Sequence, residues 1–170
     1  MVAANHALSH HKALLLSPTA SVKSLIIYII LRYLNLKTLI LVPTTSLVSQ
    51  MYNDFREYGF DVANNCHTVF AGRDKGSELP VIISTWQSIY KMQQKYFEQY
   101  ELVIGDEAHG FKSKSLTSIM TKCINAKYRI GTTGTLDGTL THKLVLEGLF
   151  GKVYKVTSTK KLIDSKYLSP

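Results

Sequence analysis

The chain has 170 residues, a length that fits one domain with a substantial buried core. Its hydrophobic share of 45% and charged share of 19% are typical of a globular protein and argue against a disordered or fibrous chain. A formal net charge of +8 is compatible with a polyanionic partner but does not require one.

Two further features bear on the surroundings of the protein. Cys66 and Cys123 lie far apart and lack the spacing of metal ligands, so we expect two reduced, buried thiols. The apolar run 24–42 is interrupted by Arg32 and Lys37, short of the ~20 apolar residues that span a bilayer. We therefore expect no membrane association and a cytoplasmic location.

Short apolar runs alternate with helical patterns along the chain. Strands are predicted at 13–16, 38–42, 67–70, 81–84, 101–105 and 128–132, and helices at 25–31, 45–59, 86–97 and 112–123. This alternation predicts an α/β fold with a mostly parallel sheet covered by helices on both faces. Ligands of such folds bind at the carboxyl ends of the strands. The basic, Ser/Thr-rich tail 152–170 is predicted to end the domain or to lead into a further part.

The segment ELVIGDEAHG, residues 101–110, combines a buried strand with charged residues at its end. Asp106 and Glu107 follow the strand at once, and His109 comes two residues later. A carboxylate at a strand end can hold Mg²⁺, and a second one can orient or deprotonate an attacking water. A solvated exit from the strand, where acidic residues are common, is the simpler alternative for any one such pair.

At this point the chain resembles a known family. Residues 106–109 are similar to the DEAH form of motif II in superfamily 2 helicases, and 131–136 to their motif III. Residues 41–55 resemble motif Ia, and 83–89 resemble the nucleic-acid motif that follows it. The resemblance runs from about Lys12 to the C-terminus and is closest to helicases that move DNA branch points. It implies a RecA-like P-loop NTPase domain, the first of the two lobes of such a helicase.

Residues 17–24, SPTASVKS, lie where motif I belongs, between the first strand and the first helix. The general pattern is G-x-x-x-x-G-K-[ST], and Lys23 and Ser24 match its last two positions. Ser17 and Val22 occupy the two glycine positions. If position 22 requires a positive φ angle, valine there costs about 1–3 kcal/mol. Two interpretations stay open, an ATP site and a phosphate loop that has lost effective binding.

The resemblance implies roles for the residues of the nucleotide site. The nucleotide would be bound by Thr19, Ala20, Ser21, Val22, Lys23 and Ser24. Lys23 would contact the β- and γ-phosphates of ATP, and Ser24 with Asp106 would hold Mg²⁺. Glu107 would position the hydrolytic water. His109 would link the γ-phosphate to the motif III threonines, Thr133 and Thr135.

The resemblance also implies a nucleic-acid face. It nominates Thr44, Thr45, Arg73, Thr85, Gln87 and Ser88 as contacts to a sugar-phosphate backbone. Thr44 or Thr45 fits equally well as a simple N-cap of the helix that follows. Trp86 could stack on a base, but a lone tryptophan beside a buried strand is more often part of a core.

The predicted function follows from these roles. Residues 1–170 are expected to form a single N-terminal RecA-like lobe, with 1–11 flexible, of an ATP-hydrolysing helicase or branch-migration translocase. The C-terminal lobe that such motors need is not in the chain, so we expect it not to unwind nucleic acid alone. The expected partner is branched or duplex DNA, with RNA also open, and the expected state is a monomer, in the host cytoplasm if the chain comes from a phage. The alternative function is a nucleic-acid-binding module with a degenerate, non-hydrolysing P-loop.

Overall fold

The computed structural model describes residues 11–16, 20–70, 74–108, 111–134, 146–151 and 153–155. The expected flexibility of the N-terminal residues therefore lies almost entirely outside the described part and stays a prediction. Within the described residues, no helix is both long and apolar enough to cross a membrane.

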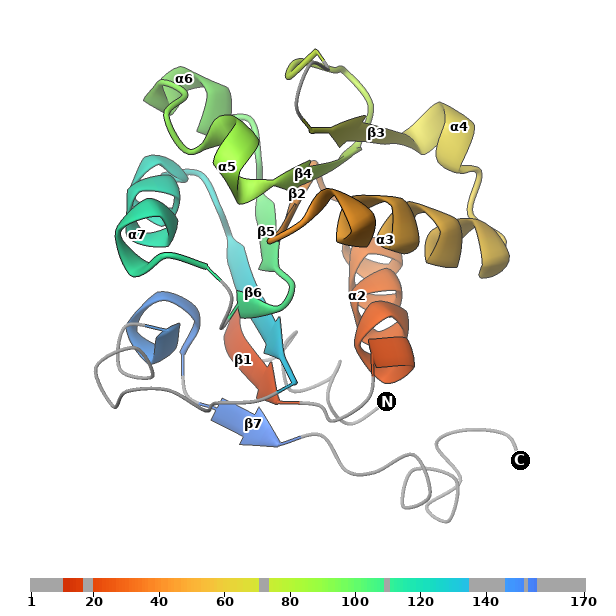
Figure 1. The fold of residues 1–170 in the computed structure, drawn as a ribbon, viewed down its shortest axis with the longest axis horizontal. Coiled ribbons are helices and arrows are strands. Elements are labelled where there is room, and N and C mark those ends of the chain that lie inside the picture. Colours follow the sequence, from red (N-terminus) through yellow and green to blue (C-terminus); the bar gives the residue numbers. More distant parts are fainter. Residues whose placement is uncertain are drawn as a thin grey trace.

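Seven strands form one sheet, and every neighbouring pair is parallel (Figure 1). The strands are β1 (Lys12–Leu16), β2 (Thr38–Val42), β3 (Cys66–Val69), β4 (Val81–Thr85), β5 (Leu102–Gly105), β6 (Tyr128–Thr133) and β7 (Val153–Lys155). Their order across the sheet is β3-β4-β2-β5-β6-β1-β7. The predicted parallel α/β fold is confirmed, and the six predicted strands match β1 to β6 within one residue at either end.

Helices cover both faces of the sheet because successive strand residues point to opposite sides (Figure 1). On one face lie α2 (Ala20–Leu34), α3 (Thr45–Glu57) and α4 (Val62–Asn65). On the other lie α5 (Trp86–Ile89), α6 (Gln94–Phe97), α7 (Ser113–Lys122) and helical residues 146–150. Ile40 packs in the core under α2 and α3, whereas its neighbours Leu39 and Leu41 pack in the core under α5 and α7.

The ends of the first two helices show why the chain turns where it does. Asn35, at φ 51°, follows α2 and donates its N–H to the carbonyl of Leu31 at 3.0 Å. Thr44 is the N-cap of α3, where its side chain accepts from the N–H of Leu47 at 3.2 Å. Gly59, at φ 94°, lies just past the end of α3, as the sequence predicted.

The single helix predicted over 86–97 is wrong. Two short helices, α5 and α6, form there instead, separated by residues 90–93. The Nζ of Lys122 on α7 donates to the carbonyls of Tyr90 and Met92, at 3.1 and 2.8 Å. These carbonyls bond to a distant ammonium group at the break between the helices. No glycine or proline in the segment signals this break.

The structure describes only a small part of the C-terminal tail. Val153–Lys155 forms β7 and pairs with β1, so the sheet extends to residue 155. That the tail ends the domain or leads into a further part stays a prediction. The helical residues just before it place Phe150 against the sheet. A Cβ on Gly131 would lie 2.9 Å from side-chain atoms of Phe150 and of Leu14, so only glycine allows this approach. A three-residue strand after an unpredicted helical turn leaves little pattern in the sequence.

Both cysteines are buried and unpaired with each other, as expected. Burial raises the pKa of the Cys66 thiol and of the Cys123 thiol to about 12 each. The nearby charge of Arg129 opposes this rise at Cys123 without cancelling it. Both groups are therefore uncharged thiols at neutral pH and belong to the cores on either face of the sheet.

Candidate functional site

The residues of motifs I and II meet at the carboxyl edge of the sheet. β6 separates β5 from β1, so the loops that follow these three strands are neighbours. Lys23 and Ser24 lie early in α2, which follows β1, and Asp106 and Glu107 follow β5 directly. Lys23, Ser24 and Asp106 are 4%, 5% and 6% exposed, so three polar side chains are withdrawn from water at one place. Buried polar groups in a cluster of this kind need specific partners.

Lys23 forms an ion pair with Glu107 across this edge. Burial lowers the pKa of Lys23, and the charge of Asp106 offsets part of that effect. Glu107 has a φ of 53°, in the left-handed region that non-glycine residues adopt at a cost of about 1–2 kcal/mol. The backbone strain therefore lies at the residue whose carboxylate meets the P-loop lysine. The sequence predicted both residues but not their direct contact.

Asp106 has a partner that the sequence analysis missed. The Oγ1 of Thr132 donates to its Oδ1 at 2.6 Å, and the bond is buried. The sheet register explains the contact, because Gly105 pairs with Gly131 and the next residue of each strand continues that pairing. Of the two coupling threonines predicted, Thr133 is fully buried at the end of β6. The sequence contains two adjacent threonines in the motif, Thr132 and Thr133. Only the register of β6 against β5 shows which of them contacts Asp106.

Ser24 has an equally unexpected partner. Its Oγ lies 2.7 Å from the hydroxyl oxygen of Tyr58, the C-cap residue of α3. The Tyr58 ring also lies 5.2 Å from the ring of Tyr28 on α2. Burial raises the pKa of Tyr58, so its hydroxyl is neutral and can either donate or accept this bond. Nothing in the sequence links a tyrosine at the end of one helix to a serine near the start of another.

Val22 does not have the conformation that its motif position suggested. It lies inside α2, and the described non-glycine residues with positive φ are His11, Asn35 and Glu107. Its side chain is 6% exposed and packs in the core under α2 and α3. The conditional cost of a positive φ at this position therefore does not arise. Valine here is a core residue of the helix.

The space at the site is small. A cavity of about 20 Å³ is lined by Lys23, Ser24, Leu47, Gln50, Met51, Asp54, Asp106 and Glu107. Its oxygen donors, a serine hydroxyl and carboxylates, are the ligand types that Mg²⁺ prefers, so the donor set fits that ion. A triphosphate requires more room than 20 Å³ and would have to separate Lys23 from Glu107. The described arrangement is thus a closed one.

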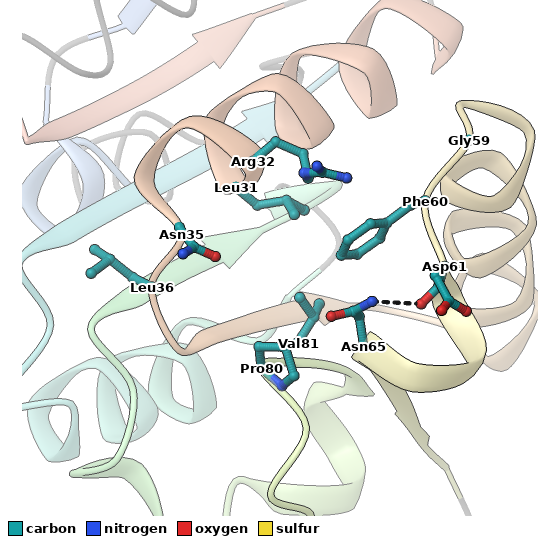
Figure 2. A pocket seen from close by; sticks show the side chains of 10 residues that line it. All are labelled: Leu31, Arg32, Asn35, Leu36, Gly59, Phe60, Asp61, Asn65, Pro80 and Val81. Atoms are coloured by element: carbon teal, nitrogen blue, oxygen red, sulfur yellow. Dashed lines mark hydrogen bonds between the residues drawn. The ribbon is translucent and has the colours of Figure 1, made fainter.

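A larger cavity, of about 360 Å³, lies elsewhere on the molecule (Figure 2). It is formed by the C-terminal end of α2, the turn after α3 and the start of β4. Phe60 points into it, and Asn65 donates to the carbonyl of Asp61 at 2.8 Å on one side. Because this cavity includes the residue that starts β4, it lies at the amino edge of the sheet. It is therefore not the site built by motifs I and II.

The described residues of the predicted nucleic-acid face lie at the carboxyl ends of β2 and β4, at the same edge of the sheet as Lys23 and Asp106. Thr85 Oγ1 lies 2.6 Å from the Oγ of Ser88. The side-chain amide of Gln87 donates to the carbonyl of Pro43 at 2.9 Å and so joins the two loops. Thr44 and Thr45 are exposed, and Thr44 is the N-cap of α3, so the nucleic-acid role of both residues stays a prediction. Trp86 is a core residue, as expected, although its Nε1 is buried without a partner.

Several predicted site residues cannot be placed. Thr19, Arg73, His109 and Thr135 lie outside the described residues. Ala20 and Ser21 begin α2, and only their backbone is described. The roles proposed for these six residues stay predictions.

Comparison with known proteins agrees with this arrangement. Residues 2–138 match the family described as type III restriction enzyme, res subunit. The chain belongs to this family. This family member has the RecA-like fold of the N-terminal lobe of superfamily 2 helicases.

Two curated relatives extend the comparison of this family member. The chain is 31% identical to the ATP-dependent DNA helicase uvsW of Enterobacteria phage T4 over 165 residues, covering 92% of the chain and 33% of that helicase. It is 27% identical to the DNA 3'-5' translocase XPB2 of Sulfurisphaera tokodaii, covering 93% of the chain and 38% of the translocase. The crystal structure of the UvsW helicase of bacteriophage T4 superposes with a TM-score of 0.82 at 32% identity, covering 91% of this chain and 58% of that one. The chain thus spans about a third of the length of the curated relatives.

Proposed function

We propose that this chain is the nucleotide-binding lobe of a DNA helicase or branch-migration translocase. It binds Mg-ATP at the carboxyl edge of the sheet and a nucleic-acid backbone beside it. The observation that carries this proposal is the convergence of Lys23, Ser24, Asp106 and Glu107 on one small cavity from two separate strand ends. The names of the two curated relatives, an ATP-dependent DNA helicase and a DNA translocase, support it. By itself the lobe is proposed to bind without unwinding.

The residues of the closed site can be assigned to parts of the ligand. Ser24 and Asp106 would hold Mg²⁺, which supplies positive charge against the phosphate oxygens when it is bound. Thr132 orients the Asp106 carboxylate through its 2.6 Å hydrogen bond. Lys23 would exchange Glu107 for phosphate, and the freed carboxylate of Glu107 would then be available to orient water. Helix α2 would add the positive end of its dipole behind Lys23.

Tyr58 is proposed to position Ser24 in this site. The change Tyr58→Phe removes the hydroxyl that lies 2.7 Å from Ser24 Oγ and keeps the ring. Groups that orient metal ligands affect metal affinity by roughly 10–100-fold, so we expect about a tenfold loss of Mg²⁺-dependent ATP affinity. Titration of a fluorescent ATP analogue with and without Mg²⁺ gives the two affinities, and their ratio measures the Mg²⁺ dependence.

The matched control is Tyr52→Phe, a half-buried tyrosine on the same helix. It should leave the ratio of the two affinities unchanged. If Tyr58→Phe lowers the affinity equally with and without Mg²⁺, Tyr58 supports the fold rather than the metal ligand.

The nucleic-acid part of the proposal rests on the loops that follow β2 and β4. The double change Thr85→Ala with Gln87→Ala removes a hydroxyl and the amide that joins these loops. We expect at least a tenfold weaker affinity for duplex DNA, since two backbone-positioning groups are lost at about 1 kcal/mol or more each. Fluorescence anisotropy with a labelled duplex measures the affinity.

Thr121→Ala with Gln99→Ala is the control for this pair. It removes the same two residue types from exposed positions at the end of α7 and before β5, near the amino edge of the sheet. Unchanged DNA affinity in the control and a clear loss in the test pair support the assignment. Equal affinities in both would place the nucleic-acid face elsewhere.

A second function has one observation in its favour. Among the described residues, the 20 Å³ cavity and the Lys23–Glu107 pair leave no room for a triphosphate. A module that binds nucleic acid and has lost nucleotide binding would keep such a site closed. Absence of any Mg-ATP binding together with retained DNA binding would select this alternative.

A further inference from the structure

A shallow groove of about 300 Å³ lies between helix α7 and the end of α5. It is lined by Tyr90, Lys91, Lys114, Ser115, Ser118 and Lys122. Helices α5 and α7 cover the face of the sheet opposite α2 and α3 (Figure 1). The groove is therefore separate from the cavity at Lys23, which opens against α3.

The lining of the groove carries only positive charge. Three of its six residues are lysines and none is acidic. The side chains of Lys91 and Lys114 are exposed, and the described part of the chain shows no ion pair for either one. Lys91 lies near the Tyr90 ring, with 5.5 Å from Nζ to the ring centre. Two ammonium groups thus face one groove without a carboxylate partner in its walls.

The third lysine holds the groove together. Lys122 donates to the carbonyls of Tyr90 and Met92, which fixes the end of α7 against the segment after α5. Its ammonium group is thereby held by hydrogen bonds within the protein. The distance between the two walls is set by these bonds, and the charge available to a ligand comes from Lys91 and Lys114.

The charge of Lys114 does not stabilise helix α7. It lies in the first turn of α7, where no acidic residue is present. A cation at the positive end of a helix dipole is disfavoured, and an anion bound there is favoured. An anionic ligand in the groove would therefore offset the unfavourable interaction of Lys114 with the helix dipole.

We propose that this groove binds the sugar-phosphate backbone of a nucleic-acid strand, with Lys91 and Lys114 each contacting a phosphate. The inference rests on the proposed function, because the groove begins at the end of α5, the helix whose N-cap is Thr85. Lys91 follows the helix that begins directly after Thr85, so one strand could pass from that face into the groove. Apart from Tyr90 the lining has no apolar side chain that could anchor a peptide, which favours a phosphate backbone over an acidic peptide.

The test compares two double variants of the whole chain. Lys91→Gln with Lys114→Gln removes the two charges available to a ligand and keeps the first half of each aliphatic stem. Lys75→Gln with Lys95→Gln removes the same charge from exposed positions outside the groove. The probe is a labelled oligo-dT strand of about 20 nucleotides, titrated by anisotropy at several salt concentrations between about 50 and 300 mM.

We expect the groove variant to bind about tenfold more weakly at the lowest salt concentration. Its plot of log affinity against log salt should be shallower by about 1.4, since each single-strand phosphate contact contributes about 0.7. The control variant should change the slope by less than about 0.3.

Four results overturn the proposal in distinguishable ways. If the groove variant and the control behave alike while the wild type binds the strand, the groove is not a contact and the proposed function stands. If the wild type binds neither this strand nor the labelled duplex at any salt concentration, the proposed nucleic-acid function is wrong and the groove assignment with it; if it binds the duplex alone, only the groove assignment is wrong. If a polyglutamate peptide displaces the strand and depends on the same two lysines, the groove binds acidic chains generally.

Discussion

Asp106→Asn is expected to remove the magnesium dependence of nucleotide binding. The carboxylate is 6% exposed and lies with Ser24 at the same small cavity, where it is the proposed charged ligand of the ion. Asparagine has nearly the same shape and keeps an oxygen that can accept from Thr132, so the fold should be preserved. Loss of the charge should weaken Mg-ATP binding by roughly 100-fold, which corresponds to about 2.7 kcal/mol. Binding measured without Mg²⁺ should change little.

The control for this prediction is Asp61→Asn, an exposed carboxylate at the start of α4. It lies at the cavity of about 360 Å³ near the amino edge of the sheet and should not affect nucleotide binding. Isothermal titration of both variants with ATP, with and without Mg²⁺, measures the two affinities. If the ratio of these affinities stays at the wild-type value in Asp106→Asn, the metal assignment is wrong.

Val22→Gly restores the glycine of the general P-loop pattern and is expected to damage the protein rather than improve it. Val22 is a buried helical residue without positive φ, so glycine would remove core packing and loosen the helix. The combined loss should be about 2–4 kcal/mol of unfolding free energy, or a fall in melting temperature of about 5–15 °C. Mg-ATP affinity, measured well below the melting transition, should stay within a few-fold of the wild type.

Val62→Gly is a closely matched control, because Val62 is 5% exposed in α4 and packs in the same core. Both variants should lose stability, and neither should gain affinity. Thermal denaturation gives the melting temperature of each variant, and a nucleotide titration gives its Mg-ATP affinity. A gain of about 100-fold in Mg-ATP affinity for Val22→Gly alone would show that valine disables the loop, and the chain would then be better described as a nucleic-acid-binding module.

The elements of the site could be predicted from the sequence because each motif lies at the end of an apolar run. Parallel strands end at one edge of a sheet, so Lys23, Asp106 and Glu107 had to come close once the strands were identified. The contacts among them could not be predicted. They depend on which residue of a strand faces its neighbour, as for Thr132, and on where a helix ends, as for Tyr58.

The same limit applies to the covering helices. The pattern of residues 86–97 is helical throughout, and the break between α5 and α6 coincides with the bonds from Lys122, a residue distant in the chain. Sequence periodicity reports local preference only, whereas this break involves a long-range hydrogen-bond donor. β7 went unpredicted for a related reason, since a strand of three residues is identified by its partner β1 rather than by its own composition.

The order of the strands has a consequence for how the protein folds. β1, near the start of the chain, pairs only with β6 and β7, which come from its far end. Forming these pairs closes a long loop, which is slow compared with the local pairing of β3 with β4. During synthesis the strand that precedes the P-loop must wait for residues 128–133 to leave the ribosome. Nucleotide binding should therefore appear only when β6 is in place, which makes it a direct report on the pairing of β1 with β6.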